Sequence, residues 1–316
     1  MKNIFVKISV LALVVGLSSC LKDDDYALDP GGVKNVVEFL DPSVPASPAG
    51  SIYPVYSTSY TLSPSAVYEI EVSYSGPEDA APQNIDVQLG VDPIALEEYN
   101  TQMTQGLYGG SPLGGTVYEL MPAELYDLGA ETLTIPKGQK KASLSITVYP
   151  DQFDFSKDYA LPLRIVSASH GALSAHFSVA LLKIGVRNIY DGIYEIVGGS
   201  ITRNSATGPD LSLGGNYVEG LTLDLITLSS NSLAIDPVWK DGSGIGGIDG
   251  TSITIDPATN LVTMKSSTNP ALKNTPATVN AYDPDTKTFT LNFDWGAAPN
   301  TRIIADLKLE YVGPRP

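Results

Sequence analysis

Polar and apolar residues alternate, position by position, in short segments that recur along much of the chain. Residues 68–74 and 143–149 both follow this pattern. Near the C-terminus, one side of the alternation is formed by Ile303, Ala305, Leu307, Leu309 and Tyr311. A period of two is typical of a β-strand with one buried and one solvated face. We therefore predict a chain built mainly of antiparallel strands joined by short turns.

One segment has helical rather than strand character. Asp92 is a favourable N-cap residue, Pro93 suits the first helical position, and residues 94–103 can continue the turns. We expect this helix to cover one end of the first domain.

Two segments share the turn sequence Asp-Pro-x-Thr-(Asn/Lys), at residues 256–260 and 283–287. Proline's fixed torsion suits the second position of a type I turn, and aspartate is favoured at the first. We predict that each segment is the tip of a β-hairpin. Asp283 and Asp285 also offer oxygen ligands to calcium, but we interpret this segment as a metal-free turn and predict no metal site.

The pattern changes near residues 185–188. Before this point lies a run of strands, and after it residues 190–194 open longer hairpins with glycine-rich loops. We predict two β-domains, residues 35–186 and residues 187–316, because the chain is long enough for two domains of ordinary size.

The chain begins like a signal peptide. Lys2 and Lys7 supply positive charge, and residues 8–17 are apolar. This apolar run is too short for a membrane-spanning helix, which needs about 20 residues, and it suits the core of a signal peptide. We predict that residues 1–19 are a lipoprotein signal peptide.

The only cysteine, Cys20, follows Leu-Ser-Ser, and this sequence resembles the lipobox of bacterial lipoproteins. The resemblance implies that the Cys20 thiol carries diacylglycerol. The alternative is a buried thiol near the end of an ordinary secretory signal. A single cysteine has no partner for an internal disulfide in either case.

The residues after Cys20, Leu-Lys-Asp-Asp-Asp, resemble the acidic export tract of surface lipoproteins in glycan-degrading gut anaerobes. A charge run of this kind also favours a solvated tether, so we assign residues 20–34 to the lipidated cysteine and an acidic tether. We expect an outer-membrane lipoprotein that faces the cell surface, with the periplasm as the alternative location.

The composition narrows the range of partners. The formal net charge is −16, and it becomes −18 once residues 1–19 are removed with two of the 19 basic residues and none of the 35 acidic ones. A chain this acidic repels nucleic acid and anionic lipid surfaces. We therefore predict no nucleic-acid partner, and membrane contact only through the lipid anchor.

Four segments between residues 91 and 168 carry a further resemblance: residues 95–100, 118–126, 133–138 and 159–165. Together they resemble the N-terminal module of unknown function in surface lipoproteins of glycan-utilisation (Sus-type) loci, a module that also precedes the catalytic domain of some endo-β-N-acetylglucosaminidases. The resemblance implies an immunoglobulin-like β-sandwich.

The C-terminal segment, residues 282–314, resembles the partner domain of the same lipoproteins. We expect this second domain to be a sandwich or a lipocalin-like barrel, so that the whole chain is all-β.

Catalytic signatures are missing from the sequence. The two histidines, His170 and His176, lack metal-ligand spacing, and no Gly-x-Ser-x-Gly elbow is present. Gly242, Gly244 and Gly247 match Gly-x-Gly-x-x-Gly, but the next segment reads as a strand where a phosphate-binding helix is needed. We interpret this segment as a flexible loop and predict neither enzymatic activity nor a cofactor, with a glycosidase as a weaker alternative.

Sugar binding calls for exposed aromatic rings, which pack on the apolar face of a pyranose, beside polar groups that bind its hydroxyls. The candidates are Trp239, Trp295, Tyr108, Tyr217 and Asn216. Trp239 precedes a glycine-rich loop and Trp295 ends a strand. For both residues the alternative is packing in the core.

Together with the lipobox and acidic tract, the resemblance to surface lipoproteins of glycan-utilisation loci implies a lipid-anchored surface protein that binds glycans for a neighbouring outer-membrane importer. A structural or adhesin-like protein that binds another protein is the alternative from a different functional class.

Mass spectrometry of the native N-terminus tests the lipid anchor. We expect a mature chain that begins at Cys20 with its sulfur acylated. The acyl chain then anchors the protein, since each buried CH₂ favours membrane attachment by about 0.8 kcal/mol. An unmodified thiol, or free protein in the culture medium, contradicts the prediction.

Overall fold

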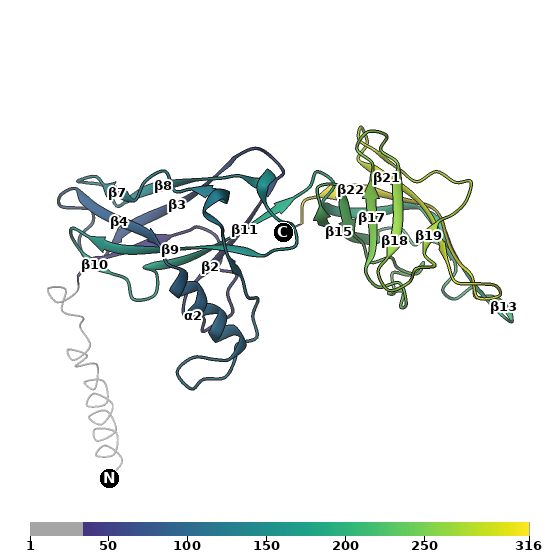
Figure 1. Ribbon diagram of the computed structural model, residues 1–316, viewed down its shortest axis with the longest axis horizontal. Coiled ribbons are helices and arrows are strands. Elements are labelled where there is room, and N and C mark those ends of the chain that lie inside the picture. The colour runs from purple at the N-terminus through teal and green to yellow at the C-terminus, as the bar shows by residue number, and fades with distance from the viewer. Residues whose placement is uncertain (1–33, 316) are drawn as a thin grey trace, which may run out of the picture.

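The computed structural model describes residues 34–315. The predicted signal peptide, Cys20 and nearly all of the acidic tether lie outside these residues. Figure 1 shows two β-rich units that follow one another along the chain, with the C-terminus returning to the region between them. Among the described residues, every helix is too short or too polar to span a bilayer.

The first unit consists of two β-sheets packed face to face. One sheet has the strand order β10 (Ala172–Leu173), β1 (Val36–Leu40), β3 (Ala66–Ser75), β8 (Lys141–Val148) and β6 (Tyr126–Asp127). The other has the order β2 (Val55–Thr61), β11 (Val179–Arg187), β9 (Tyr159–Ala168), β4 (Ile85–Val91) and β7 (Thr132–Ile135), with β5 (Glu119–Leu120) beside β9. Short 3₁₀ turns occur at Ala123–Leu125 and Pro150–Gln152. Alternate residues of both sheets form the core between them, as expected for a sandwich.

Helix α2 (Pro93–Thr104) begins where the sequence predicts. The Asp92 carboxylate accepts hydrogen bonds from the backbone N–H groups of Ile94 and Ala95, so it caps the helix. The buried side of α2 includes Leu96, Tyr99 and Met103. These side chains join a small second core against the outer face of the β2–β11–β9 sheet.

The second unit is one antiparallel sheet that curls into a barrel. The strand order is β18 (Val262–Ser266), β17 (Thr251–Ile255), β16 (Ser232–Ala234), β15 (Thr222–Ser229), β12 (Gly192–Ser205), β22 (Arg302–Gly313), β21 (Thr288–Trp295) and β19 (Lys273–Asn274). Short strands β13 (Gly208–Pro209) and β14 (Gly215–Asn216) pair with β12, and β20 (Ala281–Asp283) pairs with β21.

The two ends of this sheet meet through side-chain and backbone contacts. The Asn274 side chain on β19 accepts from the backbone N–H of Met264 at 2.8 Å and donates to the carbonyl of Val262 at 2.7 Å, both on β18. Leu261 and Ala281 form a β-bridge beside them. Of the two architectures that the sequence left open for this domain, the barrel is the one observed, and the all-β fold class is confirmed.

Both predicted hairpin tips are observed. The Asp256 and Asp283 carboxylates accept hydrogen bonds from the backbone N–H groups of Ala258 and Asp285, so both tips are Asx turns. The fifth turn residue, Asn260 or Lys287, has a positive φ of 59° or 51°. Each turn therefore ends in the left-handed conformation that reverses the chain.

The predicted facing of the last strand needs a correction. Leu307 and Leu309 are buried, but Ile304 is buried in place of Ile303 and Ala305. Strand β22 has one extra residue opposite both β12 and β21 near Asp306, whose φ is 49°. Such a β-bulge exchanges the two faces of the strand beyond it, which simple alternation cannot predict.

A buried carboxylate fixes the start of the second unit to the end of the chain. Asp191, just before β12, accepts hydrogen bonds from the Thr227 backbone N–H and hydroxyl at 2.7 and 2.8 Å. Arg315 donates to both Asp191 oxygens at 3.1 Å. Asn188 donates to the carbonyls of Ser229 and Ser232. The connection between the domains is therefore fixed to the barrel, and the end of the chain is fixed to the connection.

We expect Asp191→Ala to lower the free energy of unfolding of the barrel by about 3–5 kcal/mol, because removing one partner of a buried ion pair leaves the other charge uncompensated. The matched control in the same domain is Asp294→Ala, which removes the partner of the exposed Lys273 at 3.7 Å and should cost under about 1 kcal/mol. Denaturant unfolding followed by tryptophan fluorescence reports on the barrel, because both tryptophans lie there. Equal losses in the two variants contradict the prediction.

Gly199 is required by the bulge between β12 and β22. Its φ is +110°, and a Cβ at this position would lie 2.6 Å from the Leu307 Cα. Gly208 has a similar φ of +115° but no atom within 4 Å of an added Cβ. We expect Gly208→Ala to cost about 1–2 kcal/mol through backbone strain alone and Gly199→Ala about 2 kcal/mol more through the clash. The same unfolding measurement tests the difference, and equal costs would show that β22 shifts without resistance.

Candidate functional site

The two tryptophans proposed for sugar binding pack inside the barrel. Trp239 is 9% exposed and Trp295 is 5% exposed, with their ring centroids 6.5 Å apart. Phe293 stacks on Trp295 at 6.0 Å. Of the two alternatives that the sequence left open, the structure shows packing, so neither indole presents a flat face to a sugar.

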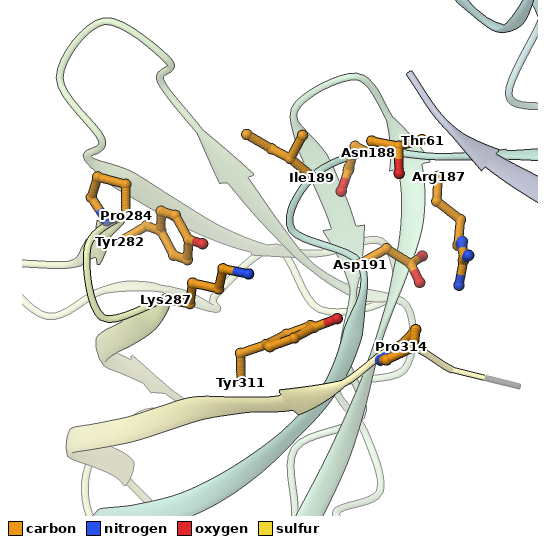
Figure 2. Close-up of a pocket in the computed structure, with 10 residues that line it drawn as sticks. All are labelled: Thr61, Arg187, Asn188, Ile189, Asp191, Tyr282, Pro284, Lys287, Tyr311 and Pro314. Atoms are coloured by element: carbon orange, nitrogen blue, oxygen red, sulfur yellow. The ribbon is translucent and has the colours of Figure 1, made fainter. Parts of the chain in front are cut away.

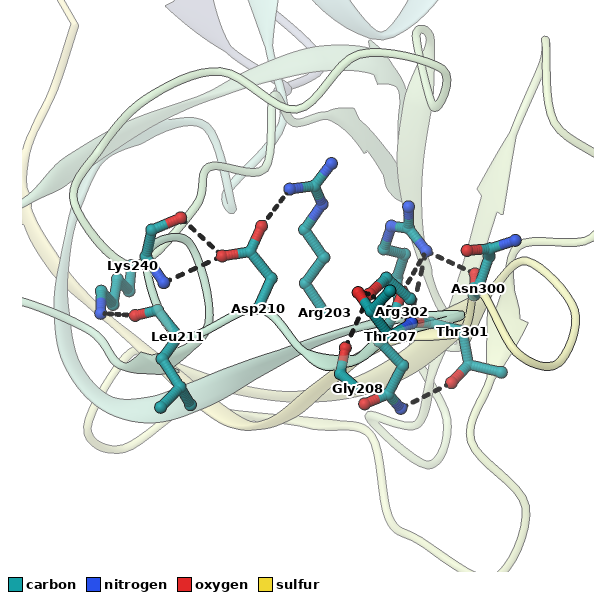
Figure 3. A network of polar contacts seen from close by, with 12 residues as sticks. Arg203, Thr207, Gly208, Asp210, Leu211, Lys240, Asn300, Thr301 and Arg302 are labelled. Carbon is teal, nitrogen blue, oxygen red and sulfur yellow. Dashed lines mark hydrogen bonds and ion pairs between the residues drawn. The ribbon is translucent and has the colours of Figure 1, made fainter.

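A polar network covers this end of the barrel (Figure 3). Arg203 lies 5.4 Å above the Trp239 ring and forms an ion pair with Asp210. The Ser212 hydroxyl and backbone N–H donate to Asp210 and lower the pKa of that carboxyl to about 2, with Arg203 contributing further. Lys240 donates to the Leu211 carbonyl at 2.5 Å. The charged groups at this end are therefore already paired with the protein itself.

The other three candidates lie apart. Tyr217 donates its hydroxyl to the Val238 carbonyl at 3.2 Å, and burial raises its pKa. Asn216 is exposed and shares with Tyr217 a depression of about 380 Å³ beside the bulge at Gly199 and Asp306. Tyr108 is 91% exposed on the loop after α2, in the other domain. The five residues therefore do not form one site.

A cavity of about 400 Å³ lies where the two domains meet (Figure 2). It is lined by Thr61, Arg187, Asn188, Ile189, Asp191, Tyr282, Pro284, Lys287, Tyr311 and Pro314. These residues come from the end of β2, the connection between the domains, the hairpin tip between β20 and β21, and the end of β22. Ligand sites occur preferentially at such domain interfaces.

Two tyrosines form the barrel side of this junction cavity. Tyr282 is held edge-to-face against Tyr190 at 4.9 Å and lies 4.7 Å from Phe289, and burial raises its pKa. Tyr311 packs against Tyr194 at 5.5 Å. In Figure 2 the hydroxyls of Tyr282 and Tyr311 point toward the open space. The cavity thus has aromatic walls with hydroxyl groups at their edges.

Two cations also line the junction cavity. The left-handed turn position of Lys287 places its ammonium group 4.9 Å from the Tyr311 ring centroid. Arg187 stands on the opposite side, beyond Asp191, and donates to the Arg315 carbonyl at 3.3 Å. The Asp191 carboxylate is itself paired with Arg315. The site therefore offers aromatic surface, hydroxyls and positive charge, which suits binding of a polar ligand.

Two further depressions share a lining residue with the junction cavity, and a third shares one with the second of these. Arg187 also lines a space of about 540 Å³ beside β2, and Tyr282 lines one of about 470 Å³ on the barrel. The latter shares Val197 with the depression that contains Asn216 and Tyr217. Two of the sequence candidates therefore lie at the far end of a series of hollows that begins at the domain junction.

Sequence reasoning missed Arg187, Lys287 and Tyr311. The only available signal was positional, because Lys287 occupies the last position of the second Asp-Pro turn and Arg187 lies in the predicted domain boundary. Within residues 34–315, no group of three or more histidine, cysteine, aspartate or glutamate side chains could hold a metal ion.

Comparisons with known proteins agree with this architecture. A family model described as "-like, N-terminal domain" matches residues 45–171, which lie in the sandwich. No curated protein matches the chain at a significant level.

Solved structures resemble nearly the whole chain. A Bacteroides ovatus protein of unknown function has a TM-score of 0.55 at 13% identity, covering 88% of this chain and 95% of that one. A second protein of unknown function from the same organism has a TM-score of 0.54 at 17% identity, covering 87% and 94%. A B. ovatus multidomain protein that includes a domain of unknown function scores 0.51 at 17% identity, covering 86% and 93%. The chain therefore shares its two-domain fold with these proteins.

Proposed function

We propose that this chain is a lipid-anchored surface protein that binds glycans for a neighbouring outer-membrane importer, and that the junction cavity holds the glycan. The observation that carries the proposal is the combination, at a domain interface, of two tyrosine rings with converging polar groups. The protein binds its ligand without changing it.

The chemistry of a sugar fits this site. A pyranose has an apolar face that packs on an aromatic ring and a rim of hydroxyls that hydrogen-bond to polar side chains. Tyr311 is only partly buried, with the Lys287 ammonium over its ring, and Thr61 lies across the cavity, whereas the Asn188 amide is already bonded to the Ser229 and Ser232 carbonyls. Tyr282 is held by its neighbours, so its hydroxyl is oriented before the ligand arrives.

The connected depressions favour a chain of sugars over a single residue. The hollows that share Tyr282 and Val197 continue from the junction toward Asn216 on the barrel. A polar surface of this kind suits successive sugar units, each held by a few weak contacts. Asn216 and Tyr217 keep the role that the sequence suggested for them, but as the distal end of the track.

The anchoring part of the proposal rests on the sequence. The lipobox-like segment ending in Cys20 and the acidic residues after it support attachment to the outer membrane facing outward. A binding protein held at this surface raises the local concentration of glycan near an importer, as tethering does for any linked pair of binding partners.

We expect Tyr311→Ala to weaken glycan binding by about tenfold or more, because truncating an aromatic anchor in a binding site typically costs over 1 kcal/mol. The measurement is affinity electrophoresis of the mature chain in gels containing the glycan that an array identifies. The control is Tyr108→Ala, which removes a fully exposed tyrosine from the other domain and should leave affinity unchanged.

Thermal unfolding of both variants separates lost binding from lost folding. A folded Tyr311→Ala protein that binds as tightly as the wild type places the glycan elsewhere. Failure of the wild type to bind any glycan, together with capture of a protein partner from intact membranes, favours the adhesin-like alternative.

A further inference from the structure

We infer that the junction cavity selects glycans that carry an anionic group, a carboxylate or a sulfate. This inference rests on the proposed function, because it names the chemical class of the ligand at the same site. It follows from the hydrogen-bond donors that line the cavity and from the pairing of its one carboxylate, Asp191, with Arg315.

The polar groups that line the cavity include the Lys287 ammonium, the Arg187 side chain beyond Asp191, and the hydroxyls of Tyr282 and Tyr311. Lysine and arginine donate hydrogen bonds and accept none. A tyrosine hydroxyl can donate or accept, and desolvation keeps that of Tyr282 protonated by raising its pKa. A ligand group that accepts several hydrogen bonds and carries negative charge satisfies this set best.

The two cations have no carboxylate partner among residues 34–315. Lys287 contacts the face of Tyr311, and Arg187 donates to a backbone carbonyl. The Arg203, Arg164 and Lys141 side chains, by contrast, each form an ion pair with a protein carboxylate. Lys287 and Arg187 therefore line the cavity without a carboxylate partner among the described residues.

Asp191 does not cancel this positive charge. Its side chain is 1% exposed, both of its oxygens accept from Arg315, and Thr227 donates to one of them. The Asp191–Arg315 pair is neutral as a unit, so Arg187 and Lys287 remain as the net charge of the cavity. In a chain with a formal charge of −16, this concentration of positive potential attracts an anion that the rest of the surface repels.

A second cationic side chain, Lys183, adjoins the first; it lies 3.6 Å from the exposed Asp158 carboxylate, so an acidic ligand there would take the place of that partner. Lys183, Gly185 and Arg187 project from the same face of β11, opposite Ser57, Ser59 and Thr61 of β2. A Cβ at Gly185 would lie 3.6 Å from the Lys183 ammonium, so the glycine leaves room for that side chain, and these residues except Thr61 line the hollow of about 540 Å³ beside the junction. The Lys183 and Arg187 backbones lie roughly 13 Å apart along the strand. An extended glycan with more than one acidic group can contact both.

The experiment compares matched glycans. Mature wild-type chain is titrated with polygalacturonic acid and its methyl-esterified form, and with chondroitin sulfate and chemically desulfated chondroitin. We expect at least tenfold tighter binding to an acidic member than to its counterpart with fewer charges, and a decline in that affinity as salt rises. The first pair reports on a carboxylate and the second on a sulfate.

The variant is Arg187→Gln combined with Lys287→Gln, which keeps hydrogen-bonding capacity and removes both charges. It should lose at least tenfold in affinity for the preferred acidic glycan and retain its affinity for a neutral one. The control, Lys140→Gln, removes one charge from an exposed position in the sandwich and should bind as the wild type does.

The outcomes separate the two proposals. If the wild type binds neutral and acidic glycans equally and the double variant is unaffected, the anion inference is overturned while the glycan function stands. If the wild type binds neither kind, both are overturned. If the acidic preference survives in a double variant that is folded by thermal unfolding, the anionic site lies away from Arg187 and Lys287, which also overturns the inference.

Discussion

The ion pair between Asp191 and Arg315 fixes the arrangement of the chain at the domain junction, on which the proposed site depends. It joins Asp191, just after the domain connection, to Arg315 near the end of the chain. Thr227 of the neighbouring strand also donates hydrogen bonds to Asp191. Asp191 lines the junction cavity and Arg315 follows Pro314, which also lines it, so this contact sets the position of Pro314, and Arg187 donates to the Arg315 carbonyl. A buried ion pair stabilises little relative to apolar packing, but it fixes one arrangement over others when each charge has a single good partner.

The same contact also sets the electrostatics of the cavity. An unpaired Asp191 would offset one of the two free cations, whereas the paired carboxylate leaves both effective. Structure and charge are thus coupled at the joint: the interaction that holds the C-terminus in place is also the one that leaves the space beside it positive.

The second domain shows why the proposed binding surface lies outside the barrel. Barrels of about this size have an interior that side chains fill or that holds one small ligand, and here Tyr194, Phe289, Phe293 and the two tryptophans fill it. The aromatic residues that make the domain stable are therefore not available to a sugar. In the proposed site, tyrosines at the rim of the barrel provide the aromatic contact with a ligand, because the tyrosine ring packs on the core while its hydroxyl reaches solvent.

Local features of the sequence predicted the corresponding structural elements accurately. The cap at Asp92, the Asp-Pro turns at Asp256 and Asp283 and the all-β class follow from preferences of a few adjacent residues, and each is observed. Features that depend on distant partners were not predictable in this way. Alternation assigned Ile303 and Ala305 to the buried face because it cannot register the extra residue near Asp306, and loop position could not show that Trp239 turns inward onto Trp295.

The sequence by itself thus determined the kinds of elements and their order, and it carries the export and lipidation signals as expectations. Tertiary structure alone decided that the last sheet closes through Asn274, that the tryptophans are core residues, and that Arg187, Lys287 and Tyr311 surround one space. The physical reason is the separation along the sequence between the residues that make each contact. Turns and caps are fixed by hydrogen bonds within a few residues, whereas this cavity joins side chains more than 120 positions apart, and their approach depends on the packing of two complete domains.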